Sequence, residues 1–359
     1  MKLNRISNVD IAELLALEAE GQEGILRRAL KRAARSAFLW PEEAVELFRA
    51  GRPLTELASI GPFLAKQLQT WLATPNLKIP IPPAIRRNFG GLAEAKTLLA
   101  SDVRQLPKLR GDLQMHTEWS DGSGSIAEMA AAAGERDYEY IAITDHSKGL
   151  KIAGGINEKD LVRQGKEIEE INSSSAQENG KVMVLRSTEL NLNPRGEGDM
   201  DPAGLRNLDL VLGSFHSALR VKDDQTERYL RALRNPDIQI MGHPRGRIYN
   251  YRLGLNADWD RVFAEATRLD KAVEIDTYPD RQDIDLSLLK IARRHGTRIS
   301  LGTDAHHPWQ LGFIDLGLAA LVRAKIPTER VINFMPLKQL QAWIAKVRRN
   351  GARKKQRKS

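Results

Sequence analysis

The sequence has no cysteine and no apolar run long enough to span a lipid bilayer. Without cysteine, a disulfide framework and a thiolate metal site are both excluded. The first residues are polar and lack the apolar stretch of a secretory signal peptide. These absences predict a cytoplasmic protein with no membrane partner.

Aromatic residues are also scarce, at 6% of the chain, whereas hydrophobic residues make up 42% and charged residues 28%. The hydrophobic and charged fractions are those of an ordinary soluble globular protein. A chain of 359 residues is too long for one small core, so we expect two domains.

The net charge of +9 is concentrated at the two ends of the chain. Residues 1–110 contain 17 Lys and Arg against 11 Asp and Glu, and residues 346–359 contain 8 Lys and Arg with no acid. Basic ends favour a polyanionic partner such as DNA, whereas the acidic middle suits a site for cations. For residues 346–359, a solvated and disordered tail is preferred over a binding arm.

Residues 1–75 are predicted to form a small helical domain, in which Pro41 is expected to open the third helix. Two short helices over 54–66 flank a tight turn and resemble a helix-hairpin-helix. The glycine of such a turn lets the backbone approach a phosphate, which N–H groups of the second helix then hold. An ordinary packing corner is the alternative. The predicted DNA-binding residues are Ile60, Gly61, Pro62 and Lys66, and the helix over 25–38 carries a basic face made of Arg28, Lys31, Arg32 and Arg35.

A proline-rich, basic linker over residues 76–110 separates this domain from residues 111–345, where strand and helix patterns alternate. Such alternation is typical of a βα-barrel, whose active site lies at the carboxyl ends of its strands. The predicted fold class is therefore α/β, a distorted seven-unit barrel preceded by a small all-α domain. The seven strands are expected near residues 113–115, 140–144, 181–188, 208–213, 238–242, 271–276 and 298–302.

Six of these strands are followed by residues that can bind a metal. Imidazole and carboxylate together suit Mn²⁺, Zn²⁺ or Fe²⁺ better than Mg²⁺ or Ca²⁺. Eight ligands are more than one ion takes, so two or three ions are predicted, with a bound hydroxide as the nucleophile towards a phosphate ester. The predicted ligands are His116, Asp121, His146, Glu189, His216, His243, Asp304 and His306.

Three residues are predicted to act in catalysis. Glu189 is suited to bridge two ions, and Asp304 lies at the end of the last strand. Arg245 follows His243 and would clamp a phosphate, although a loop salt bridge is equally compatible with its position. His295 fits the end of a helix and is left out of the site.

Together, these residues resemble a PHP domain, the polymerase-and-histidinol-phosphatase superfamily, most closely that of bacterial X-family DNA polymerases. Residues 8–75 resemble the helical N-terminal domain of the same polymerases. The resemblance implies a trinuclear, Mn²⁺- or Zn²⁺-dependent phosphoesterase associated with 3′–5′ exonuclease activity and DNA-end processing. The stretches that carry it are 112–122, 138–147, 187–190, 208–217, 243–247, 274–285 and 300–306.

Two departures from the family matter. The polymerase palm does not fit into residues 76–110, so polymerase activity is not implied. The family begins its motif with His-x-His, whereas this chain has Gln114, a weaker ligand, at the first position. The resemblance assigns the remaining ligands to three ions: His116, Glu189 and Asp304 with Gln114; Glu189, His216 and His243; and Asp121, His146 and His306.

Three functions are compatible with this sequence. The first is a metal-dependent DNA phosphoesterase, such as a 3′–5′ exonuclease or an end-processing enzyme. The second is a small-molecule phosphatase of the histidinol-phosphatase type. The third is a non-catalytic DNA-binding module whose site has decayed, with Gln114 as its mark. We rank them in this order because the near-complete site is joined to a helix-hairpin-helix and basic flanks, and because eight retained ligand positions argue against a decayed site.

Overall fold

The computed structural model describes residues 6–102, 106–175 and 182–356. The chain divides into two compact units, Met1–Val103 with Ile248–Arg252, and Arg104–Arg247 with Leu253–Ser359. Within the described ranges, none of the helices combines the length and apolar character that a membrane span requires.

The first unit is helical. Ser7 caps its first helix through a capping box with Asp10, which satisfies N–H groups that a helix start leaves free. The third helix begins at Ala44 and not at Pro41, so the predicted start was wrong. The elements are α1 Asn8–Glu20, α2 Gly24–Ala37, α3 Ala44–Arg49, η1 Leu54–Glu56, α4 Pro62–Ala73, η2 Ala84–Arg86 and α5 Leu92–Asp102.

The proline-rich segment is fastened to this helical unit. Arg86 is buried and donates to both carboxylate oxygens of Glu13 at 2.8 Å, and it also pairs with Glu20 at 2.6 Å. The described part of the predicted proline-rich, basic linker, residues 76–102 and 106–110, contains η2, α5 and Arg86, whose ion pair with Glu13 is buried. The proline pattern alone could not predict that Arg86 is buried.

The second unit is built on parallel strands. A three-stranded sheet has the order β1-β2-β3, and a five-stranded sheet has the order β4-β5-β6-β7-β8. All strand pairs are parallel, as expected where helices connect successive strands. The strands are β1 Gly111–Asp112, β2 Tyr140–Ile143, β3 Met183–Arg186, β4 Glu189–Leu192, β5 Leu212–Phe215, β6 Ile240–Met241, β7 Ala272–Asp276 and β8 Arg298–Gly302.

The two sheets together form a distorted barrel of seven strand positions. Strands β3 and β4 are separated by two residues only and continue one run, and a bridge between His146 and Glu189 joins the two sheets. On the other side, a parallel bridge between Met115 and Ala305 closes the ring. The predicted α/β fold with seven βα units is therefore confirmed.

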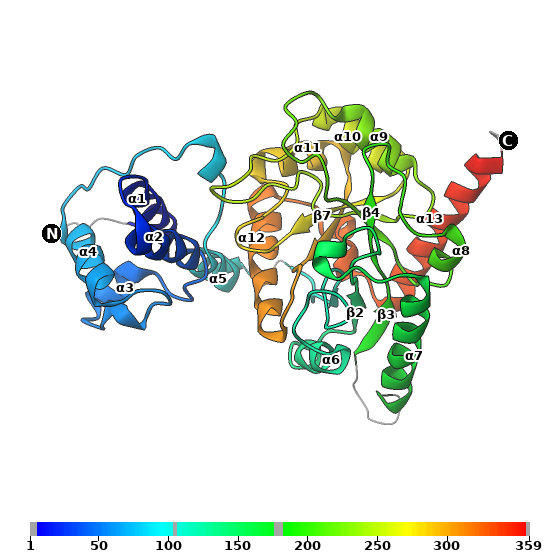
Figure 1. Cartoon of the computed structure of the whole chain (residues 1–359), viewed down its shortest axis with the longest axis horizontal. Helices are drawn as coiled ribbons and strands as arrows, with labels where there is room; N and C mark the ends of the chain where they lie inside the picture. Colours follow the sequence, from blue (N-terminus) through cyan, green and yellow to red (C-terminus); the bar gives the residue numbers. More distant parts are fainter. Residues whose placement is uncertain (1–5, 103–105, 176–181, 357–359) are drawn as a thin grey trace. The chain divides into compact units, whose positions relative to one another are not determined.

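Helices surround the strands (Figure 1). One layer packs α9, α10, α11 and α12 against β5–β8, and another packs α6 and α7 against β2 and β3. The helical elements of this unit are α6 Ile126–Gly134, η4 Lys151–Ala153, α7 Glu158–Ser175, α8 Pro202–Leu205, α9 Thr226–Arg234, α10 Trp259–Arg268, α11 Leu286–His295, η5 Pro308–Phe313, α12 Ile314–Ala324, η6 Thr328–Arg330, η7 Ile332–Phe334 and α13 Leu337–Gln356.

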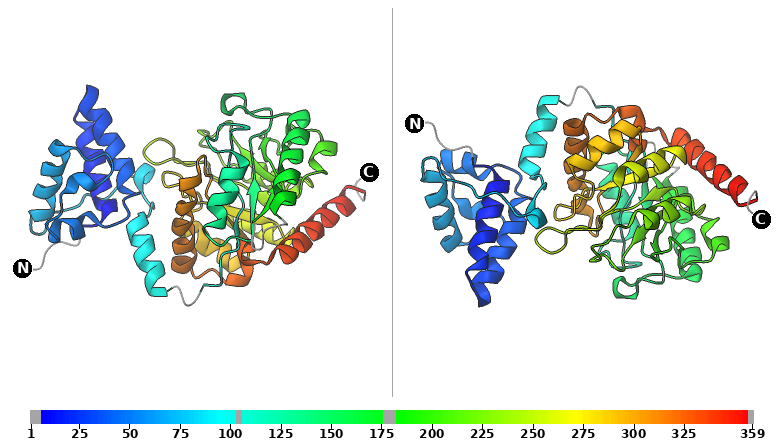
Figure 2. Two further views of the ribbon diagram at one scale, coloured as in Figure 1. Left: turned by 90° about the horizontal axis from the view of Figure 1, so that it is seen from below. Right: turned by 90° about the horizontal axis from the view of Figure 1, so that it is seen from above.

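The last helix packs at the amino ends of the strands. Leu340, Trp343 and Ile344 of α13 share a core with Tyr140 and Ala272, the first residues of β2 and β7. Figure 2 shows α13, in red, as the last helix of the chain. The helix continues through Gln356, so the prediction of a disordered tail from residue 346 was wrong over the described part.

Candidate metal centre

The loop after β1 turns Asp121 back towards His116. The N–H of Gly122 donates to the Thr117 carbonyl at 3.0 Å and closes the turn. A Cβ on Gly122 would lie 2.5 Å from the His116 carbonyl oxygen, so only glycine fits. The sequence pattern Ser-Asp-Gly thus places a carboxylate beside an imidazole.

Glu189 lies at the centre of the predicted ligands and is fully buried. Its Oε2 lies 3.1 Å from His146 Nδ1 and 3.4 Å from His116 Nε2. Its Oε1 lies 3.1 Å from His216 Nε2 and 2.5 Å from His243 Nε2. The two oxygens therefore face two different pairs of imidazoles, which is the arrangement that a bridging carboxylate needs.

Two further carboxylates flank the imidazoles. Asp121 Oδ1 lies 3.3 Å from His306 Nε2 and 3.5 Å from His146 Nε2. Asp304 Oδ1 lies 3.0 Å from His116 Nε2. The His116 ring is stacked on both His146 and His306, with centroid distances of 4.3 and 4.5 Å. All eight predicted ligands are thus brought to one end of the barrel.

The donor atoms fit metal ions. Several buried nitrogen and oxygen atoms here, among them His116 Nε2, Glu189 Oε2 and Asp304 Oδ1, have no hydrogen-bond partner of suitable geometry in the part of the chain that the structure describes. Unpaired buried lone pairs are costly unless a cation completes them. Three groups have ligand atoms within 4.8 Å of one another: His116, Asp121, His146 and His306; His146, Glu189 and His216; and His116, Glu189 and Asp304.

The electrostatics of the cluster favour the metal-binding forms of three ligands, His116, His216 and Glu189. Burial lowers the pKa of His116 and of His216, which keeps these imidazoles neutral. Burial opposes ionisation of Glu189, but the surrounding imidazoles outweigh it and hold its pKa well below the usual range. Neutral imidazoles and an ionised carboxylate are the forms that coordinate a divalent ion.

Gln114 faces another carboxylate. With its amide nitrogen turned towards Glu274, it donates to both carboxylate oxygens at 2.5 and 2.7 Å. Glu274 also accepts the backbone N–H of His243 at 2.7 Å. Glu274 thus connects Gln114, at the start of the barrel, with the segment that carries His243.

Arg245 is held in its loop. Its guanidinium donates to Asp285 at 3.2 Å and to the Leu253 carbonyl at 3.1 Å, which corresponds to the loop salt bridge that the sequence left open. Arg281 is the cation that faces the cluster, and sequence reasoning missed it. Its Nε lies 3.4 Å from Asp304 Oδ2, and 28% of its side chain is exposed. In the sequence, only its position after β7 could have indicated a site residue, because ligands follow the other strands.

In the helical unit, the predicted turn lies at the start of α4. Gly61 is the N-cap residue, and space is open around its Cα. Pro62 is the first helical residue, Lys66 is exposed, and Ile60 is buried. The helix before the turn, η1, is only three residues long, so the predicted pair of helices is shorter than expected.

Helix α2 lies beside this turn. A hydrogen bond of 2.8 Å joins the hydroxyls of Ser36, near the end of α2, and Ser59. The side chains of the basic face are exposed and form no hydrogen bond or ion pair with described residues. They are Arg28, Lys31, Arg32 and Arg35, and Arg27 of the same helix is exposed in the same way.

The fold and the cluster together define a parallel α/β barrel with a site that fits metal ions. Residues 112–278 match the family described as "PHP domain". The barrel unit of this chain therefore contains a PHP domain.

Several known proteins resemble the chain. The "DNA polymerase/3′-5′ exonuclease PolX" of Bacillus subtilis is 34% identical over 266 residues, which are 74% of this chain and 45% of that protein. The chain thus spans about half the length of that relative. A "Probable phosphatase" of Caldicellulosiruptor bescii is 26% identical over 63% of this chain and 90% of that protein.

A solved structure was also matched. The histidinol phosphate phosphatase of Lactococcus lactis, complexed with zinc, L-histidinol and phosphate, covers 60% of this chain and 94% of its own, with a TM-score of 0.42 and 18% identity.

Proposed function

We propose that this chain is a metal-dependent phosphoesterase that hydrolyses ester bonds of DNA, as a 3′–5′ exonuclease or an end-processing enzyme. The observation that carries the proposal is the convergence of four imidazoles on the two oxygens of buried Glu189. Two or three divalent ions, Mn²⁺, Zn²⁺ or Fe²⁺, would be held by the eight ligands. Bound there, they would lower the pKa of a water molecule and stabilise charge on the phosphate.

The protein's own residues would orient the substrate. Arg281 lies beside the cluster, where its Nε is 3.4 Å from Asp304 Oδ2, and its guanidinium would hold a non-bridging phosphate oxygen. Asp304 keeps Arg281 in place, whereas Arg245 is held away by Asp285. We therefore assign phosphate contact to Arg281 before Arg245.

DNA as substrate is supported by the helical unit. Helix α2 carries five exposed cations, and its Ser36 is hydrogen-bonded to Ser59 beside the open turn at Gly61. Exposed cations neutralise backbone phosphates without reading sequence. Glu189, Asp304 and Arg281 would then perform the reaction in the barrel.

A small-molecule phosphatase is the second candidate. The relatives named as probable phosphatases match the chain over about nine-tenths of their own length. Such a protein needs no DNA-binding surface, so the basic face of α2 would have another role.

The test uses the full chain with added Mn²⁺. End-labelled single-stranded and gapped DNA, p-nitrophenyl phosphate and histidinol phosphate are incubated in parallel, with His216→Ala as the inactive control. A DNA ladder that shortens from the 3′ end, and is lost in the control, supports the proposal. Phosphate release from the small esters alone favours the second candidate, and substoichiometric metal with no hydrolysis favours a decayed site.

A further inference from the structure

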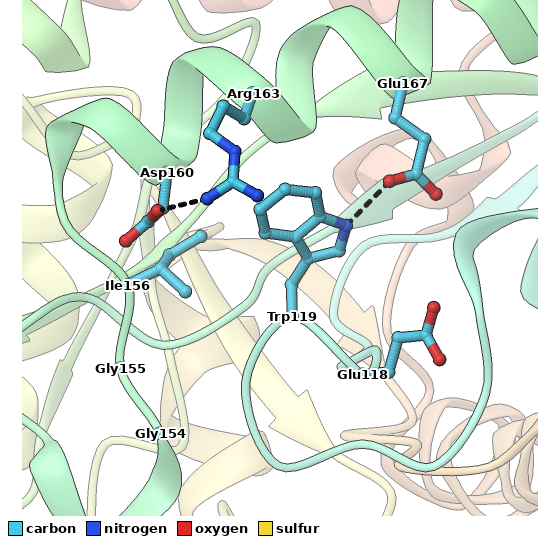
Figure 3. Close-up of a pocket in the computed structure, with 8 residues that line it drawn as sticks. All are labelled: Glu118, Trp119, Gly154, Gly155, Ile156, Asp160, Arg163 and Glu167. Carbon is cyan, nitrogen blue, oxygen red and sulfur yellow. Dashed lines mark hydrogen bonds and ion pairs between the residues drawn. The ribbon is translucent and has the colours of Figure 1, made fainter.

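A pocket beside the candidate metal centre takes no part in the chemistry described above. Its volume is about 520 Å³, which is within the usual range for small-molecule sites. Figure 3 shows the Trp119 indole in the middle of this pocket, with Arg163 near its six-membered ring and Glu118 and Glu167 on the side of its nitrogen.

The indole of Trp119 is held in one orientation. Its Nε1 donates to Glu167 at 2.8 Å, and the guanidinium of Arg163 lies 5.4 Å from the ring centroid. Arg163 is itself paired with Asp160 at 3.2 Å. The side chain of Trp119 is only partly buried, so an oriented aromatic surface is available to a ligand.

Two glycines leave one wall of the pocket without side chains. Gly154 has a φ of +67°, and a Cβ there would lie 3.0 Å from the Ser120 carbonyl oxygen. A Cβ on Gly155 would lie 2.1 Å from the Ser147 carbonyl oxygen. The backbone therefore packs closely against Ser120 of the Trp119 loop at Gly154 and against Ser147 at Gly155, where a side chain would not fit.

The pocket adjoins the candidate metal centre. Trp119 and Asp121 are two residues apart, so their Cα atoms are separated by at most about 7 Å. Ser120, between them, donates to buried Asp145, which also accepts from Gln164 of α7 at 2.7 Å. One carboxylate thus fixes the loop to the helix that carries Arg163.

The lining indicates the kind of ligand. An aromatic face binds a planar ring by stacking. Glu118 is exposed and has no hydrogen-bond partner for its carboxylate among the described residues. Carboxylates accept hydrogen bonds and do not donate them, so a ligand that meets Glu118 must present a donor, such as the N–H groups of a base. The lining holds three carboxylates, Glu118, Asp160 and Glu167, against one cation, Arg163, and this balance disfavours a phosphate.

We propose that this pocket binds the base of the nucleotide whose phosphate lies at the metal centre, and that it prefers guanine to thymine. Guanine presents adjacent N–H and NH₂ donors to a carboxylate, whereas thymine presents one N–H between two carbonyl oxygens. This inference rests on the proposed function and narrows its substrate to esters that carry a nucleobase.

The first test compares inhibitors of bis(p-nitrophenyl) phosphate hydrolysis by the Mn²⁺-supplemented full chain. We expect dGMP to inhibit about tenfold more strongly than base-free deoxyribose 5-phosphate, with dTMP between them. In Trp119→Ala, dGMP and deoxyribose 5-phosphate should inhibit equally strongly. In Glu118→Gln, the ratio of inhibition strengths between dGMP and dTMP should be smaller than in the wild type. Trp309→Ala, an exposed tryptophan outside the pocket, should keep both ratios. Equal inhibition by all three compounds overturns the inference.

The second test is independent of hydrolysis. Titration with dGMP should quench tryptophan fluorescence in the wild type and in Trp309→Phe, but not in Trp119→Phe. If no ester is hydrolysed, the proposed function fails, yet this titration still decides whether a base binds. Quenching that persists unchanged in Trp119→Phe overturns the base-binding site.

Discussion

Glu189 is the residue with the most contacts to other candidate ligands. Replacing it with Gln keeps the shape of the side chain but removes the charge that four imidazoles surround. We expect Glu189→Gln to lower both bound metal and the rate of ester hydrolysis by about 100-fold or more. Metal analysis after gel filtration and a steady-state assay measure the two effects.

The matched control is a histidine outside the site. His295 pairs with Asp260 on the surface, so His295→Gln should keep full metal content and activity. Retention of full metal content by Glu189→Gln would contradict the bridging position of this carboxylate.

Asp112 provides a residue-level prediction about pH. Burial raises the pKa of its carboxyl to about 6 from 3.8, against hydrogen bonds from Thr303 and backbone N–H groups. Above pH 6, Asp112 is charged in both states, and the buried charge costs the native state about 3 kcal/mol at most. As the pH falls from 6 to 4, the native state takes up the proton first, and this cost disappears.

Asp112→Asn should therefore be more stable than the wild type at pH 7.5, and the difference should shrink towards pH 4. Asn preserves the network, because its oxygen accepts from both backbone N–H groups and its NH₂ faces the Thr303 hydroxyl. Urea unfolding at both pH values measures the difference in the free energy of unfolding. Asp223→Asn, at an exposed position, should change little at either pH.

At the scale of elements, helix α2 is expected to contact the DNA backbone. Arg28, Lys31 and Arg32 are exposed, unpaired with described residues and spaced three and four apart on one face. Changing all three to Gln should weaken DNA binding and reduce the slope of log K against log salt by about 2. Binding to single-stranded DNA at several salt concentrations gives this slope.

The control variant removes the same charge from the other unit, through Lys166→Gln, Lys290→Gln and Lys338→Gln, all at exposed positions. If both triple variants lose affinity and slope equally, DNA binding depends on the net charge of the protein and not on the cations of α2.

The strands and their ligands could be predicted from sequence because both signals are local. Buried parallel strands are continuous apolar runs, and the ligands other than Asp121 follow such a run within a few residues. The partner of Gln114 could not be predicted, since Glu274 lies 160 residues further along the chain and meets it only across the barrel. Arg281 follows a strand, but an arginine in a loop has many possible partners.

The C-terminal residues show the same limit of prediction from sequence. Basic residues from 346 onwards indicated a free tail, yet Lys346 pairs with Asp270 at 2.9 Å and Arg348 donates to the Leu208 carbonyl. The apolar residues that place α13 at the amino ends of the strands are spread among these charges. Packing against distant strands therefore decided the structure here, and charge density alone predicted the wrong outcome.

At the scale of the molecule, metal removal should act on one of the two units. Ligand groups with metal-binding geometry, among the described residues, all belong to the barrel unit. An ion that binds only the native state stabilises it by about 2.7 kcal/mol at one hundred times its dissociation constant. A chelator should therefore lower the barrel's unfolding temperature and leave the helical transition unchanged.

Calorimetry of the full chain with and without chelator tests this expectation, and the transitions are assigned with Glu189→Gln, which should shift only the chelator-sensitive one. Added Mn²⁺ or Zn²⁺ should restore the wild-type barrel transition but not that of Glu189→Gln.

His306 makes the metal-dependent stability of the barrel depend on pH. Burial opposes its charge, but Asp121 and Asp304 outweigh burial and raise its pKa to about 9. Because an ion must displace this proton, the chelator-sensitive stabilisation should grow as the pH rises from 6 to 9. If chelator leaves the unfolding temperature of the barrel unchanged at every pH, this result contradicts a metal centre in this cluster.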